Sequence, residues 1–164
     1  MEQQAFLERA MEQYGKATYN FAYRLTGNAA DASDLTQEAY IRVYRAWASF
    51  KPGTSFLSWI YRIVTNLHRD ELRRRKTRYH EETPTAIQPI EEYVEGHLSE
   101  PVSKALAALP PEQREIVLLA DVEQCSYQEI GLIVGCPIGT VRSRLHRARG
   151  QLRKLLNHYM KSSP

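Results

Sequence analysis

The sequence predicts an all-α protein of two small helical domains, an N-terminal helical bundle and a C-terminal helix-turn-helix domain, joined by a flexible acidic linker. Apolar residues recur every three or four positions through most of the 164 residues, and no segment shows the two-residue alternation of a strand. Residues 77–101 interrupt this pattern with prolines, a glycine and glutamates, which block helix propagation and repel one another. We therefore expect the domains at residues 1–76 and 102–164.

The first helix is predicted over residues 3–25, and a stop and restart follow it. Its predicted buried side consists of Phe6, Ala10, Ala17, Phe21 and Leu25. Gly27 can adopt the left-handed conformation that ends a helix, and Asn28 can cap the next helix. Asp31 then falls in the first turn of that next helix, where a negative charge is favourable.

The second helix is predicted over residues 29–49 and has an apolar and a polar side. The apolar side consists of Ala32, Leu35, Ala39, Val43, Ala46 and Trp47. The polar side consists of Asp34, Gln37, Glu38, Ile41 and Arg45. Ile41 is either a single exposed apolar residue, which surfaces tolerate, or the centre of a protein-contact surface. The spacing alone favours the first interpretation.

The third helix is predicted from residue 54 or 55 to residue 75, and it carries a basic ridge. Its apolar stripe consists of Phe56, Ile60, Ile63 and Leu67, with Trp59 and Val64 at the edges. The ridge consists of Arg62, Asn66, Arg69, Arg73 and Lys76, and Asp70 and Glu71 are expected to lie off it. Guanidinium groups pair with phosphates, and the flanking rings of Trp59 and Tyr61 can stack on exposed bases. The ridge therefore suits a nucleic acid, with a merely solvated face as the alternative.

A short polar loop, residues 50–55, precedes the third helix. Pro52 restricts its backbone and Gly53 loosens it. Backbone amides at the start of a helix can bind an anion or the edge of a flipped base, although this signal is weak by itself.

The C-terminal domain contains a helix predicted from residue 110 or 111 to Val122, followed by a helix-turn-helix pattern. Ser126 and Glu129 form a predicted capping box for a short helix that ends at Val134. Gly135 provides the turn, and Pro137 begins the last helix. The predicted buried side of the last helix consists of Ile138, Val141, Leu145, Ala148, Leu152, Leu155 and Tyr159.

The last helix presents a basic face opposite that apolar side. The face consists of Gly139, Ser143, His146, Arg147, Gly150 and Lys154, and it is flanked by Arg142, Arg144, Arg149 and Arg153. Its N-terminal part would enter the major groove, where Arg, Ser or His bond to base edges, and later arginines would meet phosphates. A basic helix within a bundle and a helix on a membrane surface are the alternatives.

Charge is segregated along the chain, although the net charge is only +3. Residues 50–78 carry +6 and residues 137–164 carry +7, whereas residues 79–136 carry −9. Two basic blocks suggest two contacts with a polyanion, unless the charges simply solvate helix surfaces.

Composition argues against several other classes of protein. The longest apolar runs have five residues, too few to span a bilayer, and the N-terminus lacks the pattern of a signal peptide. Cys125 and Cys136 are too few for a disulfide scaffold, so we expect a cytoplasmic protein with reduced thiols. We find no glycine-rich phosphate loop, zinc-spaced cluster or paired catalytic residues, so we expect no enzyme, catalytic residue, metal or cofactor.

Five motifs in order resemble the extracytoplasmic-function (ECF) sigma factors of the sigma-70 family. They are DASDLTQEAY (31–40), FLSWIYRIVTN (56–66), LPPEQR (109–114), SYQEI (126–130) and GTVRSRLHRAR (139–149). The resemblance covers nearly the whole chain apart from the linker and the ends. One departure is Gly131, which stands where many relatives have alanine and still allows a close approach of the backbone.

The resemblance implies that the chain binds core RNA polymerase, recognises the minus-thirty-five and minus-ten promoter elements and promotes DNA melting. The polymerase contact, on the β′ coiled coil, would use Asp34, Gln37, Glu38, Ile41 and Arg45. Capture of an unstacked minus-ten base and melting would use Phe50, Lys51, Ser55, Phe56, Trp59, Arg62, Asn66, Arg69 and Arg73. Duplex recognition at minus-thirty-five would use Thr140, Arg142, Ser143, Arg144, His146, Arg147 and Arg149.

The resemblance also implies further partners. These are the β flap of the polymerase and an anti-sigma factor, with no direct insertion into a membrane. Residues 77–101 would thread through polymerase, where their acidity could mimic nucleic acid.

Two other functional classes remain open at this point. A conventional helix-turn-helix regulator would bind duplex DNA tightly without polymerase, but it leaves the ridge, the aromatic loop and the acidic linker unexplained. A zinc or redox site would need Cys125, Cys136 and some of the five histidines to come together.

Overall fold

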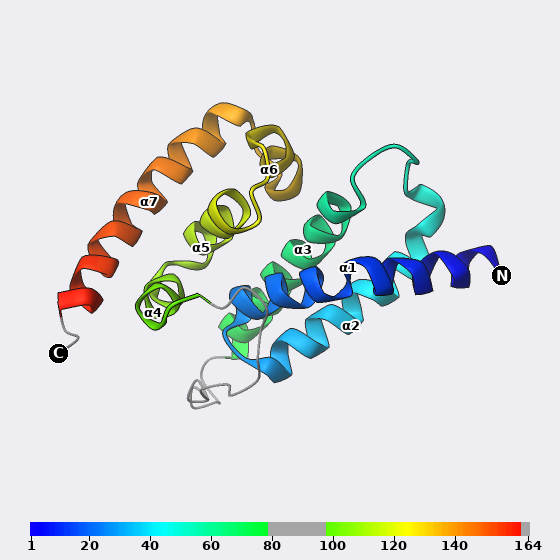
Figure 1. The fold of residues 1–164 in the computed structure, drawn as a ribbon, viewed down its shortest axis with the longest axis horizontal. Coiled ribbons are helices and arrows are strands. Elements are labelled where there is room, and N and C mark those ends of the chain that lie inside the picture. Colours follow the sequence, from blue (N-terminus) through cyan, green and yellow to red (C-terminus); the bar gives the residue numbers. More distant parts are fainter. Residues whose placement is uncertain (79–97, 162–164) are drawn as a thin grey trace. The chain divides into compact units, whose positions relative to one another are not determined.

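A computed structural model describes residues 1–78 and 98–161 of the chain (Figure 1). Those residues form helices and loops without a strand, which confirms the predicted all-α class. The chain divides into two compact units, the first containing α1–α3 and the second α4–α7. No helix in the described ranges combines the length and apolar character needed to cross a membrane. The predicted linker lies largely in residues 79–97, outside the described residues.

The first unit contains α1 (Glu2–Thr26), α2 (Ala29–Ala46), the 3-10 turn η1 (Trp47–Ser49) and α3 (Phe56–Arg78). The predicted stop and restart between the first two helices is confirmed. Gly27 has φ 78° and its amide donates to the Tyr23 carbonyl at 2.8 Å, while the Asn28 side chain accepts from the Asp31 amide at 2.8 Å. The prediction that the second helix reaches residue 49 is wrong in its last turn, which is the 3-10 turn η1.

The core of the first unit is formed where α1, α2 and α3 meet. Phe21 and Tyr61 are both buried, and their ring centres lie 4.5 Å apart. The prediction that Tyr61 flanks the basic ridge and stacks on bases is therefore wrong, because its ring is only 1% exposed. Within the same core, the hydroxyl groups of Thr18 and Tyr40 lie 3.3 Å apart, which satisfies two buried polar groups.

The second unit contains α4 (Glu100–Ala108), α5 (Pro111–Val117), the π-helical turn η2 (Leu118–Val122), α6 (Tyr127–Val134) and α7 (Ile138–Lys161). The predicted single helix to Val122 is thus wrong in its last turn, where the backbone changes to the wider π form. The start of α4 at Glu100 and the end of α3 at Arg78 each lie within the limits proposed for the linker, 77–101.

Arg114 fastens the end of α4 to α5. Its guanidinium donates to the carbonyls of Leu106 at 2.8 Å, Ala107 at 2.7 Å and Leu109 at 3.0 Å. These carbonyls lie at and just beyond the end of α4, where Leu106 also accepts from the Leu109 amide at 3.2 Å, so the side chain acts as a C-terminal cap. Burial lowers the pKa of Arg114 from its ordinary value.

The helix-turn-helix prediction is confirmed in its local chemistry. The Ser126 hydroxyl accepts from the Glu129 amide at 3.1 Å, and the Glu129 carboxylate accepts from the Ser126 amide at 3.2 Å. Gly135 has φ 76°, as the turn requires. A Cβ on Gly131 would lie 2.8 Å from the Cys136 carbonyl oxygen, so glycine does allow the expected close approach.

The α7 helix packs through a stripe that is shorter than predicted. Val141, Leu145 and Ala148 are buried. Ile138, the first residue of the predicted stripe, is 38% exposed, so the prediction that it belongs to the buried side is wrong. Its neighbours Pro137 and Gly139 are exposed as well, so this end of α7 extends beyond the residues that cover the rest of the stripe.

Candidate nucleic-acid and protein interfaces

The predicted protein-contact residues share one exposed face of α2. Asp34, Gln37, Glu38, Ile41 and Arg45 are all exposed. Ile41 is 44% exposed and lies among these polar side chains, so it offers an apolar contact at the centre of the face. Beside it, Glu38 and Arg42 form an ion pair of 3.9 Å between two exposed side chains, which leaves both groups hydrated.

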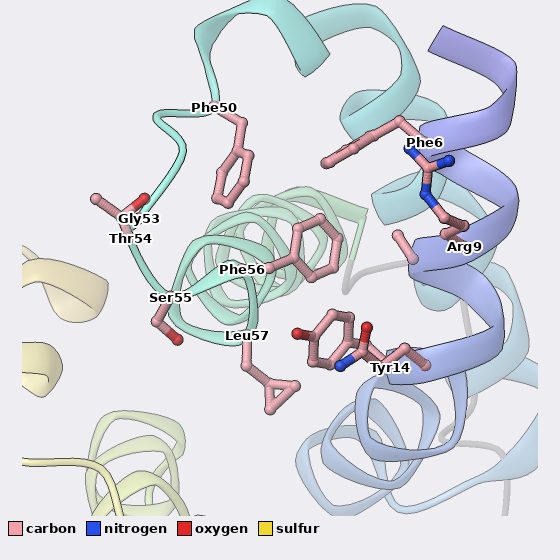
Figure 2. Close-up of a pocket in the computed structure, with 11 residues that line it drawn as sticks. Phe6, Arg9, Tyr14, Phe50, Gly53, Thr54, Ser55, Phe56 and Leu57 are labelled. Atoms are coloured by element: carbon pink, nitrogen blue, oxygen red, sulfur yellow. The ribbon is translucent and has the colours of Figure 1, made fainter. Parts of the chain in front are cut away.

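A pocket of about 370 Å³ lies between α1 and the segment from Phe50 to Leu57 (Figure 2). Its walls are formed by Phe6, Arg9, Ala10, Gln13, Tyr14, Phe50, Gly53, Thr54, Ser55, Phe56 and Leu57. The α1 side was not predicted to take part. The one indication in the sequence is that Arg9 and Gln13, which can bind a polar ligand, lie beside the apolar stripe of the first helix. No ion pair or hydrogen bond joins Arg9 to any other described residue.

Aromatic rings hold the shape of this pocket. The Phe56 ring lies 4.9 Å from that of Tyr14 in a stacked arrangement, and 5.8 Å from those of Phe6 and Trp59. The Phe50 ring lies 5.2 Å from Trp59. Phe56 is only 6% exposed, and its ring forms part of the pocket wall, so its predicted role in minus-ten binding would be a contact inside the pocket.

The loop between η1 and α3 is fixed by its own hydrogen bonds. The Thr54 hydroxyl donates to the Lys51 carbonyl at 2.6 Å, and Gly53 has φ 89°. The Ser55 hydroxyl accepts from the Ser58 amide at 3.2 Å and so caps α3. Hydrogen bonds within the loop and at the start of α3 therefore shape the segment that carries Lys51 and Ser55.

The residues of the basic ridge on α3 differ in exposure and in ion pairing, which the spacing does not predict. Arg62 and Asn66 are exposed and Arg69 is half-buried. The expectation that the acids lie off the ridge is wrong for Asp70, whose carboxylate lies 3.3 Å from the Arg73 guanidinium. Arg73 is thus partly neutralised within its own helix.

Arg75 connects the end of α3 to the start of α2. Its guanidinium lies 2.9 Å from Asp31 and 3.2 Å from Glu71. Burial of Asp31 would raise its pKa, but hydrogen bonds from Arg75 and Asn28 and the charges of Arg75 and His68 lower the pKa below the ordinary value. The Asp31 carboxylate is therefore held ionised by its neighbours.

The basic face of α7 contains two kinds of arginine. Arg144 and Arg147 are exposed, and neither has a hydrogen bond or ion pair with any described residue. Arg142 lies over the Tyr127 ring at 6.0 Å from its centre. Arg149, also predicted to contact DNA, donates from two nitrogens to Asp121, at 2.6 and 3.1 Å, so its guanidinium already has a partner within the second unit. Thr140 is half-buried, and its carbonyl accepts from the Ser143 hydroxyl at 3.1 Å.

The two cysteines are half-buried free thiols. Burial and the charges of Glu129 and Glu123 raise the pKa of the Cys125 thiol to about 12, which keeps it protonated and unreactive at neutral pH. In the part of the chain that the structure describes, no three His, Cys, Asp or Glu side chains are grouped as metal ligands.

Comparison with known proteins defines the class. The Sigma-70 region 2 family matches residues 10–78, and the Sigma-70, region 4 family matches residues 99–152. The sigma factor RpoE of Bartonella quintana, solved in complex with the anti-sigma factor NepR, superimposes with a TM-score of 0.79 and 29% identity, over 92% of this chain and 96% of that chain. These regions are those of a promoter-recognising transcription initiation factor.

Two curated relatives give the narrower family. The ECF RNA polymerase sigma factor SigW of Bacillus subtilis is 34% identical over 170 residues, which cover 94% of this chain and 90% of SigW. SigE of Mycolicibacterium smegmatis, also an ECF RNA polymerase sigma factor, is 43% identical over 157 residues, 91% of this chain but only 61% of SigE. The chain belongs to the ECF sigma factors of the sigma-70 family, as the motifs predicted.

Proposed function

We propose that the exposed face of α2 binds core RNA polymerase, that the pocket beside α1 captures an unstacked minus-ten base, and that α7 reads the minus-thirty-five duplex. In this proposal, residues 1–76 bind polymerase and the minus-ten element, and residues 102–164 bind the minus-thirty-five element. Residues 77–101 pass through the polymerase between them. The proposed partners are the β′ coiled coil, the β flap, promoter DNA and an anti-sigma factor. The chain acts in the cytoplasm and catalyses no reaction.

The pocket is the observation that carries the proposal. It has the size of a small-molecule site, its rings offer stacking surfaces, and Arg9 and Gln13 offer donors and an acceptor for a base edge. A duplex keeps its bases stacked and would leave such a pocket empty, whereas opened DNA can place one base in it. The exposed cation of Arg62 lies six residues, about 1.7 turns, after the wall residue Phe56 on α3, where it suits the adjoining phosphates.

Structural similarity to a sigma factor that was solved with its anti-sigma factor supports an anti-sigma partner for this chain. The Bartonella quintana RpoE structure contains the anti-sigma factor NepR, and its fold extends over nearly all of this chain. The exposed apolar side chain of Ile41 is one contact that such a partner would cover.

In vitro transcription with core polymerase and a promoter library tests the proposal. Phe50→Ala should relax base preference in the minus-ten element only, because it removes one stacking ring of the pocket. Arg147→Ala should relax one minus-thirty-five position and cost about 1–3 kcal/mol on the best promoter. Lys161→Ala, an exposed cation at the far end of α7, is the matched control.

Two outcomes would overturn this assignment. Unchanged base preference in both variants would show that neither the pocket nor α7 recognises promoter bases. Tight, specific binding of a duplex promoter by the chain without polymerase would favour a conventional helix-turn-helix regulator.

A further inference from the structure

One ion pair ties the proposed recognition helix to the rest of the second unit. The Arg149 guanidinium of α7 donates from Nη2 to Asp121 Oδ1 at 2.6 Å and from Nε to Asp121 Oδ2 at 3.1 Å. Asp121 belongs to η2, 28 residues earlier in the chain. Two parallel hydrogen bonds between planar groups fix both distance and orientation, which a single contact does not.

The backbone around Asp121 is unusual in a way that serves this contact. In the π turn, the Glu123 amide donates to the Leu118 carbonyl at 2.8 Å, five residues back instead of four. Directly after it, Gln124 has φ 55°, a conformation that costs a non-glycine residue energy. Asp121 therefore lies within the wider turn, immediately before this change of backbone conformation.

Tyr127 adds to the same contact from the start of α6. Asp121 first, and then Tyr127, raise the pKa of the Arg149 guanidinium above its ordinary value. The Arg142 guanidinium lies 6.0 Å from the centre of the Tyr127 ring, a cation–π distance. Arg142 and Arg149 are two turns apart on α7, so one side of that helix is held at two points by η2 and α6.

We propose that Asp121 is a positioning residue that clamps Arg149 to orient α7 and withholds this cation from DNA phosphates. The inference rests on the proposed reading of duplex DNA by α7. Asp121 and Arg149 are 39% and 43% exposed, so the pair lies at the surface beside the DNA-facing side of the helix. A closed pair is electrically neutral there, whereas Arg144 and Arg147 remain available to the DNA. An open pair would add a sequence-independent phosphate contact and lower discrimination between promoters and other DNA.

Stability alone is a poor explanation for this pair. An exposed ion pair adds only modestly to folding stability because water screens it, although bidentate geometry such as this is the most favourable case. The left-handed backbone of Gln124 offsets part of that gain. The role that this arrangement supports is control of the orientation of α7 and of the charge that Arg149 presents to DNA.

Holoenzyme carrying Asp121→Asn, Arg149→Gln or both tests the inference, with binding to cognate promoter and to unrelated duplex measured between 50 and 200 mM KCl. Asp121→Asn keeps the side-chain shape and frees Arg149, so its salt slope on unrelated duplex should steepen by about 1. That change corresponds to about 3.5-fold more affinity lost over this salt range than wild type loses. Arg149→Gln should leave the slope unchanged, and both variants should lower the ratio of cognate to unrelated binding.

The double variant distinguishes positioning from two independent contacts. If the clamp is the function of both residues, the double variant should discriminate no worse than Arg149→Gln alone. A slope about 1 shallower in Arg149→Gln, with Asp121→Asn unchanged, would make Arg149 an ordinary phosphate contact and overturn the inference. Arg147→Ala serves as the reference: if it leaves cognate binding unchanged, the proposed function fails first, whatever the clamp does.

Discussion

Replacing Ile41 by aspartate should weaken binding to core polymerase about 30- to 1000-fold and leave the fold intact. Ile41 is 44% exposed, so a partner that covers it buries a little under half of the side chain. Full burial of an isoleucine is worth up to about 3 kcal/mol, which makes this share worth about 1.3 kcal/mol. An aspartate left without a partner in the same place costs about 1–3 kcal/mol more. The total of about 2–4 kcal/mol gives the stated range.

Titration of labelled chain with core polymerase, followed by fluorescence anisotropy, measures this effect directly. Ile41→Ala removes the apolar contact without adding a charge, so it should cost only about 1 kcal/mol, about fivefold in affinity. Met11→Asp is the matched control, because Met11 is an apolar side chain on α1 with a similar exposure of 49%. Thermal melts by circular dichroism should show both aspartate variants close to wild type, since surface changes of this kind rarely cost more than about 0.5 kcal/mol.

The reasoning fails if Ile41→Asp binds core polymerase within twofold of wild type, because the exposed face of α2 would then not be covered in the complex. It also fails if Met11→Asp weakens binding as much, since the effect would then come from added negative charge anywhere on the first unit.

Two other predictions concern stability. Ser126→Ala removes the capping box of α6 and should cost about 1 kcal/mol in urea unfolding of the second unit, with Ser143→Ala, an exposed serine within α7, as the control; equal midpoints for Ser126→Ala and wild type would contradict the role of the cap. Asp31→Asn tests the lowered pKa of that carboxyl: the advantage of wild type should be complete above the unfolded pKa of about 4 and shrink as pH falls through the lower folded pKa. Urea midpoints at pH 7 and pH 3 measure the change, and a wild-type advantage that grows toward pH 3 would contradict it.

Local signals made the helix ends and the helix-turn-helix predictable. Gly27 and Asn28, and likewise Ser126 and Glu129, satisfy backbone groups within three or four residues, so the relevant chemistry is contained in a short window of sequence. Gly135 with its positive φ is of the same kind. The polar face of α2 was predictable because it depends only on helical periodicity.

Contacts between distant residues were not predictable from periodicity. The spacing along the third helix places Tyr61 beside the basic ridge, yet its ring packs against that of Phe21, 40 residues earlier, with the ring centres 4.5 Å apart. The α1 wall of the pocket depends on how α1 and the residue 50–57 segment meet in space, and the Arg149–Asp121 pair joins residues 28 apart. Helical periodicity predicts the direction in which a side chain points but not the residue from another helix that it contacts.

The charge available to DNA therefore differs from the charge counted along the chain. In the basic block of α3, Arg73 pairs with Asp70, and Arg75 pairs with both Asp31 and Glu71. Arg62, nearer the pocket, has no such partner among the described residues. Because a neighbouring carboxylate offsets part of the charge that an arginine presents to a phosphate, we expect unpaired cations to mark the path of DNA better than the number of arginines does. On the first unit we therefore expect the opened strand to contact the pocket and Arg62 more closely than the paired Arg73 and Arg75.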